Sequence, residues 1–362
     1  MTIKPDRKTI LIVEDTPEHI EILVHCLREE YATQVALGGE LALQIINTDP
    51  MPDLILLDVI MPGTIDGHMV CSRLKASKRT RDIPIIFTTA LGAVHDESLG
   101  FELGAVDYIS KPFNTTLVRA RIKNHIELKG LRDTLEAQVH ERTRELALTQ
   151  DAAIYGLGIL AEFRDTETGM HIKRTQTYVG LLARHLQANP KFSGYFDETT
   201  IRLLVNSAPL HDIGKVGVPD NILRKPSSLT AEEFALIKKH TTFGRGVVDQ
   251  IEEAMHDKMA SEFLHFAKEV TYTHHECWNG NGYHGLKGEE IPVSGRLMAL
   301  ADVYDALTSK RVYKSALPHE EALHIIIKGD GRTLPEHFDP EVLQAFIDLG
   351  EAFRAVSEKW QD

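Results

Sequence analysis

The sequence predicts a multidomain protein in which an α/β domain with a doubly wound parallel sheet is joined by a long helix to an all-α domain. Three observations predict this fold class. The chain has 362 residues, whereas one domain usually has roughly 100 to 200. Short apolar runs alternate with amphipathic stretches before residue 125, and helical periodicity dominates after residue 151. We therefore expect a first domain at 1–125, a helical linker at 126–150 and a second domain at 151–362.

The composition is that of a globular protein with an acidic surface. Hydrophobic residues make up 43% and charged residues 26% of the chain, close to the globular average. The formal net charge of -13 repels nucleic-acid phosphates and acidic lipids, and no basic recognition helix follows the first domain. No stretch approaches the roughly 18 consecutive apolar residues of a membrane span. We therefore expect a cytoplasmic protein that binds neither DNA nor a membrane directly.

Each expected strand of the first domain is a short apolar run bounded by polar residues. The runs are TILIV (9–13), QVAL (34–37), LILL (54–57), PIIF (84–87) and YI (108–109). Their alternation with amphipathic stretches predicts a parallel sheet with helices on both faces.

Polar side chains follow the carboxyl ends of these runs, where ligands of doubly wound sheets bind. They are Glu14, Asp15, Asp58, Thr88, Thr89 and Lys111. The three carboxylates suit a hard cation such as Mg²⁺, and the cation and the lysine could together neutralise a phosphoryl group. The alternative for any one of them is a solvated acidic cap, which is a weak explanation for the set.

Residues 8–125 resemble the receiver domain of two-component response regulators, which has a flavodoxin-like fold. The resemblance rests on Glu14 and Asp15, on DVIMPGTIDG from Asp58, on TTA at 88–90, and on GAVDYISKPF ending at Phe113. It implies that a sensor histidine kinase supplies the phosphoryl group and that Asp58 accepts it. It also implies that Glu14 and Asp15 help to hold Mg²⁺, that Thr89 and Lys111 contact the phosphoryl group, and that the bond between Lys111 and Pro112 is cis.

The expected linker is a long charged helix with a narrow apolar seam. After residue 115 proline is absent over the following stretch, and apolar residues recur at intervals of three, four and seven. The seam consists of Leu128, Leu131, Leu135, Val139 and Leu146. Such a seam suits a partner helix better than a globular core, so we expect a homodimeric coiled coil. The alternative is a single solvated connecting helix.

The second domain contains histidines and carboxylates in a pattern typical of metal ligands. His211 and Asp212 are adjacent in HDIGK, and Glu167 and His171 stand four apart, on one face of a helix. The alternative for Glu167 and His171 is an ordinary side-chain contact between a glutamate and a histidine on one helix. The full donor set is Glu167, His171, His211, Asp212, His240, His274, His275 and Asp302. These oxygen and nitrogen donors are too many for one tetrahedral zinc and suit two or three divalent transition ions.

From about residue 150 to 350 the chain resembles the HD-GYP family of HD-superfamily phosphohydrolases. The resemblance rests on RDTETGMHIKRT, HDIGKVGVPDNILRKPSSLT, HHECWNGNGYHGLKGEEIP, ADVYDALTSKRVYK and FDPEVLQAF. It implies that the donor set holds the metals, with Glu167 and His171 completing a third position. It also implies cyclic di-GMP as substrate, opened to linear pGpG and in some members on to GMP. Iron or manganese is favoured, and nickel or zinc could also bind such ligands.

One departure from the family lies at its Gly-Tyr-Pro motif. This chain has Gly282, Tyr283 and His284, with a loop one residue shorter, and Asn279 where the family has aspartate. Losing proline changes the rigidity of the loop. We expect His284 to be an exposed loop residue, and the alternatives are an extra metal ligand or a substrate contact. Two alternatives to hydrolysis of cyclic di-GMP remain open. The domain could be a degenerate sensor or protein-interaction module, or it could hydrolyse another cyclic dinucleotide.

Several residues are candidates for catalysis and substrate binding. Asp212 acts through the metals, and Lys215 could bring a positive charge to the scissile phosphate. The candidate substrate contacts are Lys215, Tyr283, Asp305, Arg311 and Lys314. For the last four, surface salt bridges and core packing are equally good explanations. Phosphorylation of Asp58 is expected to regulate the phosphodiesterase through the linker.

Overall fold

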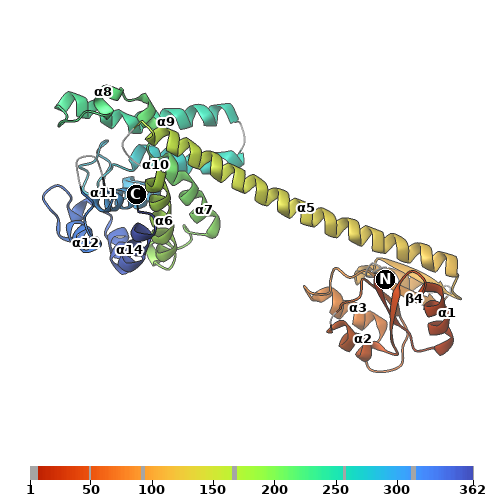
Figure 1. The fold of residues 1–362 in the computed structure, drawn as a ribbon. Coiled ribbons are helices and arrows are strands. Elements are labelled where there is room, and N and C mark those ends of the chain that lie inside the picture. Colours follow the sequence, from red (N-terminus) through yellow and green to blue (C-terminus); the bar gives the residue numbers. More distant parts are fainter. Residues whose placement is uncertain are drawn as a thin grey trace, which may run out of the picture. The chain divides into compact units, whose positions relative to one another are not determined.

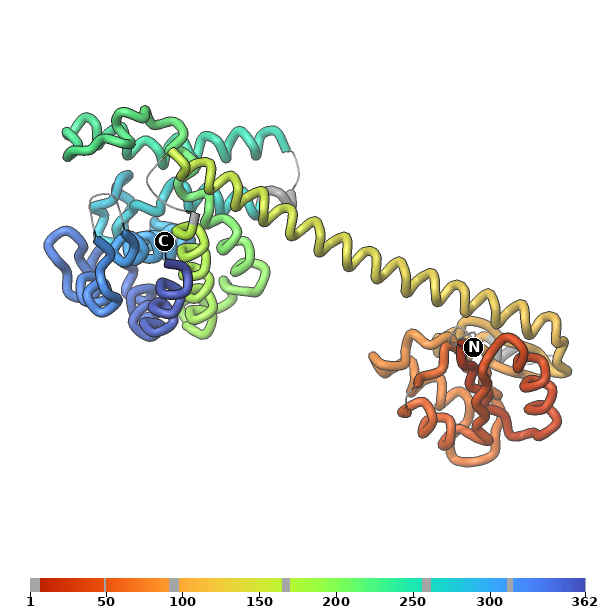
Figure 2. Tube along the Cα trace, viewed as in Figure 1, coloured from red at the N-terminus to blue at the C-terminus, as the bar shows by residue number. Residues whose placement is uncertain are grey.

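A computed structural model describes residues 7–48, 50–90, 94–164, 169–255, 258–310 and 315–361. It divides the chain into two compact units, Met1–Thr143 and Arg144–Asp362. Helix α5 (Thr115–Glu162) is continuous over 48 residues and contributes to both units, as the trace in Figure 2 shows. Among the described residues, no helix combines the length and the apolar character that a membrane crossing requires.

The first unit contains the expected five-stranded parallel sheet. Its strands run in the order β2-β1-β3-β4-β5. The strands are β1 (Thr9–Val13), β2 (Ala32–Ala36), β3 (Leu54–Asp58), β4 (Ile85–Ala90) and β5 (Asp107–Lys111). Each lies on one of the apolar runs that predicted it, and the α/β fold class is confirmed.

Helices cover both faces of this sheet (Figure 1). Successive strand residues point to opposite faces, so Leu11 and Val13 lie in one apolar core while Ile10 and Ile12 lie in the other. The first core is completed by α2 (Gly39–Ile46) and α3 (Gly67–Ala76), and the second by α1 (Pro17–Leu27) and the start of α5. Helix α4 (Val94–Glu102) lies between β4 and β5 in the sequence. Burial on both faces explains why the inner strands β1, β3 and β4 consist mainly of apolar residues, whereas the edge strands β2 and β5 are more polar.

The turn after β3 is held tightly by a glycine. A Cβ atom at Gly67, the first residue of α3, would lie 2.1 Å from the carbonyl oxygen of Asp58. The preceding Asp66 caps α3 by accepting a hydrogen bond from the backbone N–H of Met69 at 2.8 Å. These contacts hold Asp58 at the carboxyl end of the sheet.

Every regular element in the described part of the second unit is helical, which agrees with the predicted all-α domain. The α-helices are the end of α5, α6 (Gly169–Leu186), α7 (Glu198–Ser207), α8 (Asp220–Leu223), α9 (Ala231–Met255), α10 (Lys258–Thr273), α11 (Val293–Thr308), α12 (His319–Lys328), α13 (Pro340–Asp348) and α14 (Gly350–Lys359). Short 3-10 helices are η1 (Pro190–Phe192), η2 (Ala208–Leu210), η3 (Ile213–Gly217), η4 (Gly288–Glu290) and η5 (Pro335–His337). The largest apolar core lies around Tyr178, Tyr304, Phe346 and Phe353.

Two close backbone approaches bring the candidate ligands together. A Cβ atom at Gly214, in η3, would lie 1.9 Å from the carbonyl oxygen of His240, so η3 rests directly on α9. A Cβ atom at Gly158, in α5, would lie 2.8 Å from the carbonyl oxygen of Pro209. The last turns of α5 therefore pack against η2, immediately before His211.

Candidate metal centre

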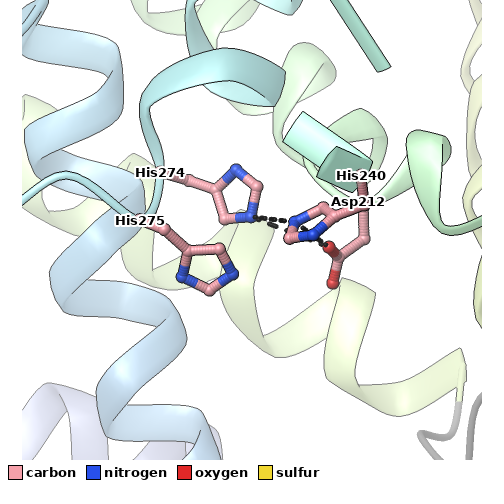
Figure 3. A group of neighbouring side chains, drawn as sticks. All are labelled: Asp212, His240, His274 and His275. Carbon is pink, nitrogen blue, oxygen red and sulfur yellow. Dashed lines mark hydrogen bonds and ion pairs between the residues drawn. The ribbon is translucent and has the colours of Figure 1, made fainter. Parts of the chain in front are cut away.

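The candidate ligands of the second unit form two neighbouring groups. Their ligand atoms lie within 4.8 Å of one another in each group. Figure 3 shows the first group, and its members are Asp212, His240, His274 and His275. The members of the second group are Glu162, His171 and His211. Side chains from the ends of α5 and α10, from α6 and α9, and from the turn between η2 and η3 therefore meet in one buried region.

Local hydrogen bonds orient three of these imidazoles. The Nδ1 atoms of His211, His240 and His274 lie 2.7–2.9 Å from backbone carbonyl oxygens three or four residues earlier in the chain. Because a carbonyl oxygen can only accept, Nδ1 carries the proton. A neutral imidazole then has its lone pair on Nε2, and this is the atom that faces the other ligands.

The inward-facing atoms suit a cation. Nε2 of His240 lies 3.3 Å from Nε2 of His274, and the two lone pairs cannot satisfy each other. Asp212 Oδ1 is buried, accepts no hydrogen bond, and lies 3.2 Å from Nε2 of His240. A divalent ion among these atoms would satisfy both nitrogens and the oxygen. Nitrogen and carboxylate donors without a thiolate fit a borderline transition metal.

Electrostatics keep Asp212 ionised. Burial alone would raise its pKa, but the charges of Lys215 and His211 outweigh burial and hold the pKa well below its usual range. Lys215 Nζ lies 2.8 Å from Asp212 Oδ2. Burial and the neighbouring His274 hold the pKa of His275 well below its usual range, so the His275 ring is neutral and free to ligate.

His211 is the exception among the imidazoles. Burial by itself would lower its pKa, but the adjacent Asp212 outweighs burial and raises it. Nε2 of His211 lies 3.2 Å from Asp212 Oδ2 and 3.4 Å from Nε2 of His171. A proton and a divalent cation therefore compete for this nitrogen.

The second group contains a residue that the sequence patterns did not identify. Glu162, the last residue of α5, is 2% exposed, and its Oε1 lies 3.6 Å from His171 Nε2. Asp302 Oδ1, on α11, lies 3.8 Å from the same nitrogen. The expected partner Glu167 lies outside the described residues. The available signal for Glu162 was a lone acidic residue within the apolar stretch GLGILAEF.

Asp305 was a candidate substrate contact in the sequence, with core packing as the alternative. In the structure it is 1% exposed and accepts a hydrogen bond from His171 Nδ1 at 2.8 Å. Arg174, also buried, donates to both of its oxygens at 2.7 and 3.0 Å. The pKa of Asp305 is lowered, because His171 and Arg174 outweigh the effect of burial. Asp305 therefore lies behind His171, where a carboxylate orients a metal-binding imidazole.

The loop with the altered Gly-Tyr-Pro motif lies beside the first group. The ring of Tyr283 lies 4.5 Å from that of His275, and Lys238 Nζ lies 5.0 Å from the centre of the tyrosine ring. Burial raises the pKa of Tyr283 to about 12, so its hydroxyl is protonated. His284 is half-buried rather than exposed, because its ring packs on Tyr272. The candidate substrate contacts Arg311 and Lys314 lie outside the described residues.

The first unit brings together a separate acidic site at the carboxyl ends of its strands. Glu14, Asp15 and Asp58 offer oxygens within 4.8 Å of one another. Lys111 Nζ donates to Asp58 Oδ2 at 2.7 Å and lies 2.9 Å from Glu14 Oε2. The hydroxyl oxygen of Thr89 is buried at the same edge. The expected cis bond between Lys111 and Pro112 is present.

The charges of this edge favour a bound cation. Burial raises the pKa of Asp58, and the nearby carboxylate of Glu14 adds to the rise against the hydrogen bond from Lys111. The pKa of Glu14 is lowered, because Lys111 and His19 outweigh the effect of burial. One lysine faces two buried carboxylates, and a hard divalent cation would relieve their repulsion.

The folds and sites of the two units define a class of protein in which a receiver-like α/β domain is joined to a helical domain with clustered candidate metal ligands. The family model of the response regulator receiver domain matches residues 10–123, and that of the HD domain matches residues 194–342. The chain belongs to the response regulators that carry an HD-type phosphodiesterase domain.

Three relatives illustrate this membership. A Vibrio cholerae protein named "Probable cyclic di-GMP phosphodiesterase" is 43% identical, over 98% of this chain and 80% of the relative. A cyclic di-GMP phosphodiesterase of Thermotoga maritima is 33% identical, over 98% of this chain and 94% of the relative. A second Vibrio cholerae protein, named 3'3'-cGAMP-specific phosphodiesterase 2, is 35% identical over 60% of this chain and 38% of the relative.

Proposed function

We propose that this protein hydrolyses cyclic di-GMP to linear pGpG at a cluster of two or three divalent metal ions, with GMP as the candidate product of a second cleavage. The observation that carries the proposal is the inward-facing pair of Nε2 atoms from His240 and His274 around the buried oxygen of Asp212. The names of the relatives support cyclic di-GMP as the substrate.

The reaction consumes one water for each phosphodiester. The water oxygen forms a bond to phosphorus, the bond from phosphorus to the 3′ oxygen breaks, and the released 3′ oxygen takes up a proton. The product keeps a 5′ phosphate. When bound, clustered divalent ions lower the pKa of water and stabilise negative charge on the phosphate.

The chain itself supplies orientation and charge around this centre. Asp305 holds the Nδ1 proton of His171, so the Nε2 lone pair of that ring faces the ligand group. Lys215 brings an ammonium group to Asp212, where it can also bind a non-bridging phosphate oxygen. Tyr283 offers a protonated hydroxyl and an aromatic face beside His275, where a guanine base could stack.

Turnover by metal-loaded protein tests the proposal. The protein is purified under reducing, oxygen-free conditions, its metals are quantified, and cyclic di-GMP and pGpG are followed on the same sample. We expect turnover in the wild type. Asp212→Ala should lower the turnover rate by more than roughly 10- to 100-fold. Loss of a residue that only hydrogen-bonds to a metal ligand already costs that much. Glu289→Ala, whose side chain is 75% exposed, is the control. Tight binding of the nucleotide without turnover would favour a sensor module instead.

A second candidate substrate is 3',3'-cyclic GMP-AMP. One relative is named for its specificity toward that compound, and the changed loop around Tyr283 alters the surface beside the ligand group. A competition assay with equal concentrations of the two dinucleotides distinguishes the candidates. Preference for cyclic di-GMP by kcat/KM supports the first proposal, and the reverse preference supports the second.

We also propose that a sensor histidine kinase phosphorylates Asp58 with the help of Mg²⁺ held by Glu14 and Asp15. The ion pair between Lys111 and Asp58 supports phosphorylation at this position. After phosphorylation the Lys111 ammonium group could bind an oxygen of the phosphoryl group on Asp58. The regulatory part of the proposal is tested by comparing activity with and without acetyl phosphate. A change that is absent in Asp58→Asn supports it, and equal changes in both proteins contradict it.

The linker helix supports a homodimer. The seam residues Leu128, Leu131, Leu135, Val139 and Leu146 are between 50% and 71% exposed. Such a row of exposed apolar side chains on one helix suits a second copy of the same helix. Light scattering should give twice the chain mass for the wild type and the chain mass for Leu135→Asp. Leu148→Asp, off the seam and 60% exposed, should remain dimeric.

A further inference from the structure

The side chain of His284 connects its loop to α9, which carries His240, and to α10, which ends directly before His274. Its Nε2 lies 2.9 Å from Oγ1 of Thr241 on α9, and its ring stacks on Tyr272 of α10. The two ring centroids are 3.9 Å apart and the interplanar angle is 14°. Thr241 directly follows His240, and Tyr272 stands two residues before His274. Residue 284 therefore contacts a neighbour of each histidine in the facing Nε2 pair.

The direction of the bond to Thr241 follows from local chemistry. The Thr241 hydroxyl donates its one hydrogen to the carbonyl oxygen of Lys238 at 2.8 Å. Its oxygen can therefore only accept from His284. The proton of the His284 ring consequently lies on Nε2, and the imidazole acts as a donor across the gap between the loop and α9.

The backbone of His284 has an equally specific partner. Its N–H donates to Oε1 of Glu276 at 2.7 Å, and the N–H of Leu286 donates to Oε2 at 2.8 Å. Glu276 is 3% exposed, so these two donors satisfy a buried carboxylate. A proline at 284 has no N–H and would remove one of the two donors. The loop of this chain is therefore built for a residue with a backbone N–H at that position.

The neighbouring Tyr283 is the side chain that this arrangement orients. Its ring packs against His275 at 4.5 Å and lies 6.0 Å from Phe234 of α9. A Cβ atom at Gly282 would lie 2.5 Å from Cα of Glu276, so the chain before Tyr283 is also held closely. Contacts on both sides of Tyr283 thus define where its hydroxyl and aromatic face lie.

We propose that His284 is a positioning residue for the phosphodiesterase reaction, replacing the rigidity of the family's proline with a side-chain hydrogen bond, a ring stack and a backbone donor to Glu276. It acts through Tyr283 and does not touch the reacting phosphate. The proposal rests on the proposed function, because Tyr283 is assigned there to substrate binding.

The first test measures the loop without substrate. Amide hydrogen exchange of residues 279–289 is compared in metal-loaded wild type, His284→Ala and His284→Pro. We expect faster exchange in both variants, because one loses the side-chain contacts and the other loses the donor to Glu276. His265→Ala, in which a 65% exposed histidine of α10 is removed, should leave this exchange unchanged. Wild-type exchange in His284→Pro would overturn the proposal. This readout is independent of whether cyclic di-GMP is the substrate.

The second test measures the effect on the reaction. His284→Ala should raise KM for cyclic di-GMP by about five- to tenfold, as expected for one lost hydrogen bond and one lost ring contact, with a smaller change in kcat. His284→Gln, which retains a side-chain N–H donor, should recover part of the loss. In a Tyr283→Ala background, His284→Ala should add no further loss. Independent effects of the two substitutions would show that His284 does not act through Tyr283.

If the wild type turns over no cyclic dinucleotide with any metal, the proposed function fails, and hydrogen exchange alone then decides whether His284 holds the loop. If the wild type is active and KM is unchanged in His284→Ala, the positioning role fails while the proposed function stands.

Discussion

Asp305 offers the sharpest test of how this structure links stability to metal binding. Its carboxylate and the Arg174 guanidinium are 1% and 2% exposed, and His171 shares the same carboxylate. In Asp305→Ala the guanidinium keeps its bonds to the Trp360 carbonyl oxygen and the Ser309 hydroxyl but loses the two hydrogen bonds and the opposite charge of Asp305. Breaking a buried ion pair from one side costs about 3–5 kcal/mol. Over a unit of this size, that loss lowers the melting temperature by about 6–20 °C.

The same substitution should also weaken metal binding. His171 would lose the acceptor that fixes its Nδ1 proton and its ring orientation. Loss of such a partner lowers metal affinity by about 10- to 100-fold. Both effects would follow from one carboxylate, so the experiment must separate them.

A double variant separates the two effects. In Asp305→Leu with Arg174→Met the buried charges are removed together, which is usually neutral or stabilising. Its stability should return close to that of the wild type, while its metal affinity should stay low, because His171 still lacks an acceptor at Nδ1. Recovery of metal affinity along with stability would refute the idea that Asp305 orients His171.

Tryptophan fluorescence in urea is a suitable assay for the stability arm. The chain has two tryptophans, and both, Trp278 and Trp360, lie in the second unit, so the signal follows unfolding of that unit alone. A chelator in every sample removes the contribution of bound metal to stability. Unchanged stability of Asp305→Ala under these conditions would contradict the expected cost of breaking the buried ion pair between Asp305 and Arg174.

Three further predictions follow from the two sites. Glu162→Gln should lower the bound metal by one ion per chain in elemental analysis, whereas Glu141→Gln, an exposed change on the same helix, should not; equal metal contents would exclude Glu162 as a ligand. Asp58→Asn should abolish the phosphate-dependent gel shift produced by acetyl phosphate and Mg²⁺, and a persisting shift would assign phosphorylation to another residue. Gly282→Ala should destabilise the second unit by about 1–3 kcal/mol, because the added Cβ overpacks the loop, lying 2.5 Å from Cα of Glu276; unchanged urea unfolding would show that the loop relaxes freely.

The sequence was sufficient to predict the elements of the first unit and the kinds of donor in the second. Each strand includes a short apolar run, and burial on both faces requires that pattern in the inner strands β1, β3 and β4. The acidic residues at the carboxyl ends of β1 and β3 could be grouped because the carboxyl ends of parallel strands meet at one edge. In the second unit, His211–Asp212 and His274–His275 were identifiable as donors from residue type alone.

The sequence was less informative about which partners these donors meet. Glu162 ends a long helix, and no periodic pattern distinguishes it from the solvated carboxylates of the same helix. His284 was predicted to be exposed, because a loop position gives no sign of the Tyr272 ring that covers it.

Asp305 shows why the sequence does not reveal which partner a donor meets. Its partner His171 lies 134 residues away, and only the packing of α6 against α11 brings the two side chains within hydrogen-bonding distance. Residue type and local spacing determine which atoms can bind a metal or a proton. Burial and the choice of partner depend on helices that are distant in the sequence, so tertiary structure alone decided that Asp305 pairs with His171 and that Glu162 lies beside the same imidazole.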